Sequence, residues 1–171
     1  MKRMLCFVLF VLMLLLVACG PSEKEVIEQL DVQARIGFNQ SPTEPNQELL
    51  PFAIYLPEGY KVESDDETNV VFRQTDQLYL LFHNPFENQQ SATYFEALED
   101  LEDTLFLQAY EGDDYFGYVY LRSLESDYEL QVGIGGTRIT TQTGLDQIEV
   151  EVTQLITILT SILFEDTETT D

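Results

Sequence analysis

Hydrophobic positions along the chain predict a sheet of short strands followed by an amphipathic helix. The most regular apolar pattern lies near the end, where the spacing is always three or four residues: Leu145, Ile148, Val152, Leu155, Leu159 and Ile162. This spacing places all six side chains on one face of a helix. We therefore predict a long C-terminal helix that packs against the rest of the fold.

Short segments upstream have the alternation and the β-branched or aromatic content that are typical of strands. They cover residues 50–56, 60–64, 69–74, 78–83, 106–110, 115–123 and 128–134. The links between successive segments are short, which favours antiparallel pairing. Residues 78–83 are apolar on both faces, so we expect a central strand that is covered on both sides.

A second helix is predicted over residues 94–104. Thr93 and Glu96 fit a capping box before it. Strands, helix, strands and helix in this order indicate the α+β class. We expect an antiparallel sheet of about six to seven strands sandwiched by helices, in a single domain over residues 48–164. Residues 165–171 are expected to form a disordered acidic tail.

The first 20 residues have the pattern of a secretory signal. Lys2 and Arg3 precede 15 apolar residues, and a small residue stands before Cys19. Fifteen apolar residues are short for a membrane-spanning helix, which needs about 20. An uncleaved membrane anchor is the alternative interpretation, and it also leaves the following chain outside the cytoplasm.

The segment Leu16-Val17-Ala18-Cys19 resembles the lipobox of bacterial lipoproteins. The resemblance implies that residues 1–18 are a signal peptide and that Cys19 receives a diacylglyceryl thioether. It further implies a lipid anchor on the extracytoplasmic face of a cell membrane, and two acyl chains suffice for stable anchoring. Residues 19–47 are expected to be a tether, within which residues 23–34 could form a short helix.

Two segments of the domain resemble PsbP-like domains. They are PFAIYLPEGYKV at residues 51–62 and LITILTSILF at residues 155–164. The resemblance implies a sheet between helices, a fold that occurs in photosystem accessory proteins and in small bacterial lipoproteins. Neither segment carries a catalytic motif, so the resemblance leaves the function open.

Charge narrows the choice of partners. Residues 19–171 keep all 31 acidic residues and 6 of the 8 basic ones, because Lys2 and Arg3 belong to the signal, and their formal net charge is −25. Such a charge repels nucleic acid and anionic lipid headgroups. It is compatible with a basic extracytoplasmic protein or a small ligand as the partner.

Residues suited to catalysis or metal binding are few. Cys6 leaves with the signal and Cys19 is the lipid site, which leaves no thiol for a disulfide or a thiolate metal site. His83 is the single histidine, and we expect a structural role for it. Acidic turns at residues 64–67 and 111–114 could attract calcium but lack EF-hand spacing, and we expect them to be solvated. No cofactor or metal is predicted.

An aromatic strand gives the candidate binding surface. Phe116, Tyr118 and Tyr120 alternate along residues 115–123 and so share one face. Tyrosine rings can bind a ligand while their hydroxyls stay hydrated, although the same rings could simply pack beneath the helices. We expect a non-enzymatic, lipid-anchored binding or accessory module. A carboxylate-dependent glycan hydrolase and a purely structural surface lipoprotein remain the alternatives.

Overall fold

The fold is α+β, as predicted. The computed structural model describes residues 21–50 and 52–164. Its elements in chain order are α2 (Glu23–Phe38), β1 (Gln47–Glu48), β2 (Phe52–Ile54), β3 (Tyr60–Asp65), β4 (Asn69–Gln74), β5 (Gln77–His83), α3 (Thr93–Glu96), β6 (Thr104–Glu111), β7 (Phe116–Ser123), β8 (Tyr128–Ile134), β9 (Thr137–Thr143), α4 (Ile148–Thr160) and β10 (Leu163–Phe164). The proposed signal at residues 1–18, the lipid site Cys19 and the acidic tail at residues 165–171 lie outside the described residues.

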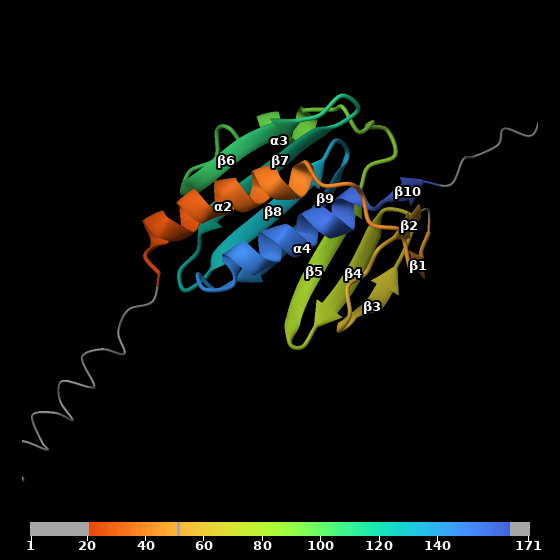
Figure 1. Cartoon of the computed structure of the whole chain (residues 1–171), viewed down its shortest axis with the longest axis horizontal. Helices are drawn as coiled ribbons and strands as arrows, with labels where there is room; N and C mark the ends of the chain where they lie inside the picture. Colours follow the sequence, from red (N-terminus) through yellow and green to blue (C-terminus); the bar gives the residue numbers. More distant parts are fainter. Residues whose placement is uncertain (1–20, 51, 165–171) are drawn as a thin grey trace, which may run out of the picture.

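Seven antiparallel strands form the main sheet in the order β3-β4-β5-β9-β8-β7-β6 (Figure 1). The predicted strand over residues 50–56 pairs elsewhere: β2 joins β1 and β10 in a small second sheet. Strand β9 was not predicted, although it lies near the centre of the main sheet. Its inward-facing residues Thr137, Thr141 and Thr143 are polar but buried, so the hydrophobic pattern does not reveal it.

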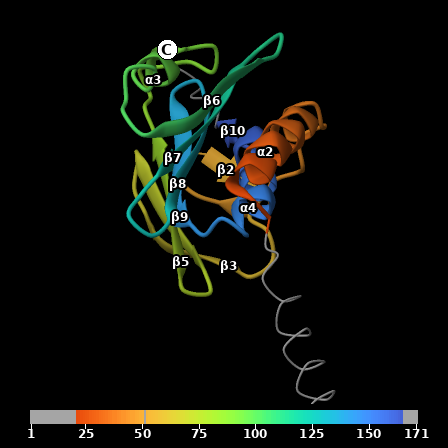
Figure 2. The same cartoon turned by 90° about the vertical axis from the view of Figure 1, so that its left-hand side faces the viewer.

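Two long helices cover one face of the main sheet, and α3 lies on the other side (Figure 2). The core between the sheet and the long helices contains Val70, Phe72, Leu81, Val119, Leu121, Leu130, Val132, Ile139, Val152, Leu155 and Leu159. The predicted C-terminal helix is present as α4, with Ile148, Val152, Leu155 and Leu159 buried. Its apolar face packs on β8 and β9.

Helix α2 corrects the expected tether. Val26, Leu30, Ala34 and Phe38 are all buried, and α2 packs along α4. Ser22 begins the helix through a capping box with Glu25, in which each side chain bonds the other residue's backbone amide. The folded domain therefore begins at Glu23 instead of residue 48.

Helix α3 is much shorter than the predicted helix over residues 94–104. It ends at Glu96, and Thr93 provides no cap because its hydroxyl bonds Ser91 and Glu87. Four acidic residues between positions 99 and 103 would lie at the negative end of a longer helix, which disfavours its continuation.

Strand β5 is central, as predicted, but only one of its faces is fully covered. Tyr79 and Leu81 face the core, whereas Leu78 and Leu80 on the other face are 48% and 45% exposed. The segment that includes α3 covers only one end of this outer face: Tyr94 packs edge-on against Phe82. The rest of the outer face lies open.

Candidate functional site

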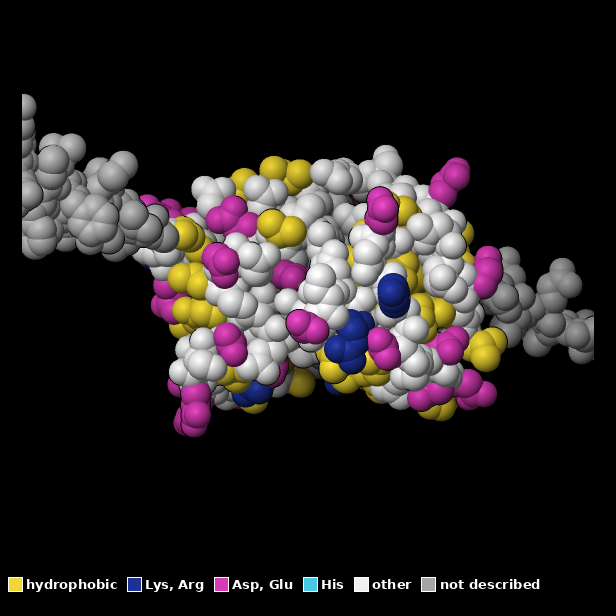
Figure 3. All heavy atoms as spheres, turned by 90° about the horizontal axis from the view of Figure 1, so that it is seen from below, with side chains coloured by type: hydrophobic (Ala, Val, Ile, Leu, Met, Phe, Trp, Pro, Cys, Tyr) yellow, Lys and Arg dark blue, Asp and Glu magenta, His cyan; other side chains and the backbone are white. Residues whose placement is uncertain are grey.

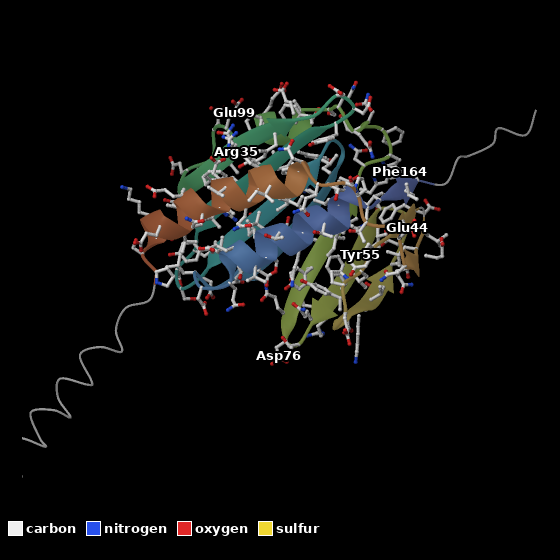
Figure 4. The ribbon with its side chains drawn as sticks, in the orientation of Figure 1. Arg35, Glu44, Tyr55, Asp76, Glu99 and Phe164 are labelled. Carbon is white, nitrogen blue, oxygen red and sulfur yellow. The ribbon has the colours of Figure 1, made fainter. Side chains whose placement is uncertain are left out.

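A cleft of about 320 Å³ opens where β5 ends and β9 begins, and we call it the His83 cleft. Its lining comes from the end of β5, from the following loop, from the β8–β9 turn and from β10: His83, Pro85, Glu87, Asn88, Gln89, Ile134, Gly136, Thr137 and Phe164. Figure 4 shows Phe164 at the end of the domain opposite the start of α2. The volume lies at the lower end of the range for small-molecule sites.

The imidazole of His83 is held firmly in this cleft. Its Nδ1 lies 2.9 Å from the Thr137 hydroxyl oxygen. Its ring centroid lies 4.8 Å from that of Phe164 and 5.8 Å from that of Phe52. Burial lowers the pKa of His83, so the imidazole is neutral at neutral pH. Such a ring offers Nε2 as a single donor or acceptor beside an aromatic surface.

Two glycines allow one wall of the cleft to form. Gly135 has a φ of 52°, and a Cβ there would clash with the carbonyl oxygen of Asn88. The backbone of the loop at residues 84–89 forms two hydrogen bonds with this turn. The Gly136 amide donates to the Asn88 carbonyl at 3.2 Å, and the Gly136 carbonyl accepts from the Asn84 amide at 2.9 Å. The glycine run at residues 133–136 is therefore a tight strand turn beneath a packed loop.

A second cavity of about 230 Å³ adjoins the His83 cleft. Both cavities are lined by Gln89 and Ile134. Phe38 and Tyr115 contribute to the second cavity, and the Tyr115 hydroxyl donates to the Phe38 carbonyl at 2.8 Å. The C-terminal end of α2 is thus part of the same region of the surface.

The predicted aromatic surface at Phe116, Tyr118 and Tyr120 is covered. The three side chains do share the sheet face opposite α2 and α4, but Tyr118 is only 1% exposed and Tyr120 is fully buried. The Phe95 ring, from α3, lies 5.4 Å from Phe116 and 6.3 Å from Tyr118. The segment that includes α3 therefore occupies the surface that a ligand would have needed.

From the sequence, His83 was predicted only as a structural residue, and neither Thr137 nor the loop that faces it was identified. The available signals were weak: an Asn84-Pro85 strand end and a Gly135-Gly136 turn. Neither signal shows that the two segments meet, because they are about 50 residues apart. Phe164, which lies just after the last helix, contacts His83 and Phe52.

Carboxylates are abundant, but they do not converge in the His83 cleft. Among the described residues that line it, Glu87 is the single carboxylate. The acid with the most unusual environment is Glu151, which lies in the core, where its Oε1 accepts from the Tyr79 hydroxyl at 2.9 Å. Its other oxygen is buried without a partner among the described residues, and burial raises the pKa of Glu151.

Metal ligands do not gather in the described part of the chain. Within residues 21–50 and 52–164 there is no group of three or more histidine, aspartate or glutamate side chains that could hold an ion. In the acidic turn at residues 64–67, Asp66 accepts from the backbone amides of Thr68 and Asn69, and these bonds lower the pKa of Asp66. No described helix is long and apolar enough to cross a membrane.

Basic side chains are few and mostly occupied. The described residues include 27 acidic and 6 basic side chains, since four acids lie in residues 165–171 and Lys2 and Arg3 precede residue 21. Four basic residues form ion pairs: Lys24 with Glu28, Arg35 with Asp31, Arg73 with Glu63 and Arg122 with Glu129. Acidic side chains are spread over the face shown in Figure 3, with few basic ones between them.

Comparisons with protein-family models, with curated proteins and with solved structures gave no match to the chain. The resemblances to bacterial lipoproteins and to PsbP-like domains therefore stay predictions from the sequence.

Proposed function

We propose that this protein is a lipid-anchored extracytoplasmic binding module that holds a small ligand or a partner's side chain in the His83 cleft. One observation carries the binding part of the proposal: a neutral imidazole, the Phe164 ring and a glycine turn together line a cavity of about 320 Å³. The lipobox at Cys19 supports the anchored part.

The chemistry of the cleft favours binding over hydrolysis. Glycoside hydrolysis needs two carboxyl groups about 5 to 10 Å apart across the substrate. Among the described residues that line the His83 cleft, Glu87 is the single carboxylate. Glu151 points into the core, where it accepts a hydrogen bond from Tyr79. A planar, uncharged or cationic group would suit this cleft best, because it can stack on Phe164 and meet Glu87 without repulsion.

A binding test can use His83 itself as the reporter. Because the chain contains one histidine, its imidazole proton signals identify the cleft in an NMR spectrum without further assignment. We would titrate a panel of small planar amides and aromatic amines and follow these signals. At least one compound class is expected to shift them saturably.

Two neighbouring variants make the binding test specific. Phe164→Ala removes a ring from the cleft, whereas Leu163→Ala alters an exposed neighbour that does not line it. Binding should weaken markedly in the first variant and persist in the second. Equal affinities in both variants, or no shift with any compound, would contradict a ligand site in the His83 cleft.

The anchor has a separate test. The full chain expressed in a bacterium should yield a mature protein whose first residue is Cys19, with the added mass of a diacylglyceryl group. Cys19→Ala should abolish both the cleavage and the added mass. If Cys19→Ala still fractionates with the membrane as the wild type does, the lipobox assignment is wrong.

A further inference from the structure

We infer that the lipid anchor fixes the orientation of the domain, with the β7–β8 turn toward the membrane and the His83 cleft directed away from it. This inference rests on the proposed lipidation of Cys19. It follows from the short distance between that residue and a rigid helix. The orientation defines a membrane-facing end and an outward-facing end of the same domain.

The tether between Cys19 and the domain is short. Only Gly20, Pro21 and Ser22 separate Cys19 from α2, which begins at Glu23. Three extended residues span about 10 Å. Because the Ser22–Glu25 capping box holds the first turn, the start of α2 stays within that distance of the lipid.

Helix α2 cannot pivot on the domain. Its buried residues Val26, Leu30, Ala34 and Phe38 pack against α4 and the sheet along the whole helix. At its start, the Tyr128 hydroxyl donates to the Glu23 carboxylate at 2.9 Å. This contact places the β7–β8 turn, residues 124–127, beside the anchored end.

The His83 cleft lies toward the other end of α2. Helix α2 has 16 residues, so its length is about 24 Å at 1.5 Å per residue. The cavity that adjoins the His83 cleft is lined by Phe38 at the far end of this helix. Figure 1 shows the start of α2 and strand β10 at opposite ends of the domain. The β3–β4 turn lies at this far end too, since the His83 amide donates to the Thr68 carbonyl.

The charges at the membrane-facing end determine which membrane suits this orientation. Glu23, Glu125, Asp127 and Asp146 lie on or beside this end, and Lys24 there is paired with Glu28. Anionic headgroups would repel these carboxylates, but at physiological salt the repulsion decays over about 8 Å, which is close to the reach of the tether. A zwitterionic surface therefore permits the closest approach, and a strongly anionic surface at low salt would increase the gap.

The experiment compares two single-cysteine variants of the full, lipidated chain. Glu125→Cys labels the membrane-facing end and Glu67→Cys labels the β3–β4 turn. The two variants are matched, because both sites are exposed glutamates in turns and both lose one negative charge. The mature chain has no other free thiol if Cys19 is lipidated, so each fluorophore attaches at one position. The labelled proteins are reconstituted into phosphatidylcholine vesicles that contain a headgroup spin-labelled quencher lipid.

We expect the label at position 125 to lose most of its fluorescence and the label at position 67 to keep most of it. Inserting 20 Gly/Ser residues between Gly20 and Pro21 should abolish this difference, since such a linker reaches about 25 Å. Equal or reversed quenching in vesicle-bound protein would overturn the orientation while leaving the anchor intact. Recovery of the wild-type chain free of vesicles would overturn the anchor, and with it the orientation.

Discussion

Helix α2 provides the sharpest test of the fold, because it lies in a stretch that the sequence presents as a tether. The change we propose is Leu30→Ala, in a chain that starts at residue 19 and carries Cys19→Ala. Leu30 is completely buried between α2 and the rest of the core. If residues 23–38 were an undocked tether, this substitution would remove no contact with the domain.

The expected loss follows from the burial of the side chain. A buried leucine replaced by alanine costs about 2 to 5 kcal/mol, which combines the lost transfer free energy with the cavity left behind. For a domain of this size, each kcal/mol lowers Tm by about 3 to 5 °C. We therefore expect Tm to fall by about 6 °C or more.

The assay is urea and thermal unfolding followed by circular dichroism, with Val32→Ala as the matched control. Val32 lies on the same helix, two residues away, and is 45% exposed. Its replacement should change the free energy of unfolding by no more than about 0.5 kcal/mol. Equal stabilities of the two variants would refute the docking of α2 and restore a domain that begins near residue 48.

Two further predictions concern the interior. Burial raises the pKa of Glu151, so its contribution to stability is fully present below the ordinary carboxyl pKa of about 4.5 and is lost as pH rises through the raised value. Above about pH 4.5, Glu151→Gln should therefore be more stable than the wild type, by a margin that grows with pH. Urea unfolding of both proteins from pH 4 to 8 measures this margin. A difference in stability that does not change with pH would contradict ionisation of Glu151 as its cause. A Cβ at Gly133 would collide with the Tyr118 ring, whereas at Gly144 it would lie 3.1 Å from a side-chain oxygen of Asp146. In thermal unfolding, Gly133→Ala should lower the free energy of unfolding by about 1 to 3 kcal/mol, and Gly144→Ala should lower it much less. Similar losses in the two variants would argue against the packing of Tyr118 on Gly133.

Much of the fold could be predicted from periodicity. The three-and-four spacing that begins at Leu145 identified α4, because one face of that helix is almost entirely apolar. Most strands of the main sheet were located by alternation and turn residues. Where the pattern is dominated by burial on one face, a single sequence contains the needed information.

Other parts of the fold could not be predicted from the hydrophobic pattern, because polar residues are buried there or surround the buried ones. Strand β9 buries threonines whose hydroxyls bond within the fold, as the Thr141 hydroxyl does with the Leu78 carbonyl at 2.8 Å. The apolar residues of α2 have the spacing of a helix face, but the many charged residues between them and the polar stretch that follows resemble a linker. The aromatic face of β7 was recognised, but the segment that covers it was predicted as a longer helix over residues 94–104, and nothing in the sequence shows that Phe95 packs on this face.

The candidate site was the least predictable feature, since it depends on contacts between distant segments. His83, Gly136 and Phe164 belong to three elements that meet only when the sheet and α4 are complete. A lone histidine carries no spacing signal, and its pKa is lowered by burial that the sequence does not record. The site could be located only after the topology had placed β5 beside β9.

Stability and orientation are linked, because α2 serves as both a core helix and the connection to Cys19. While α2 is docked, the proposed anchor is three residues long and the domain has little freedom to turn. If α2 detached, the link would extend from Gly20 to the start of β1 at Gln47, with a flexible reach of about 25 to 30 Å. Leu30→Ala should therefore weaken the difference in quenching between labels at positions 125 and 67 under conditions where α2 detaches, and Val32→Ala should preserve it.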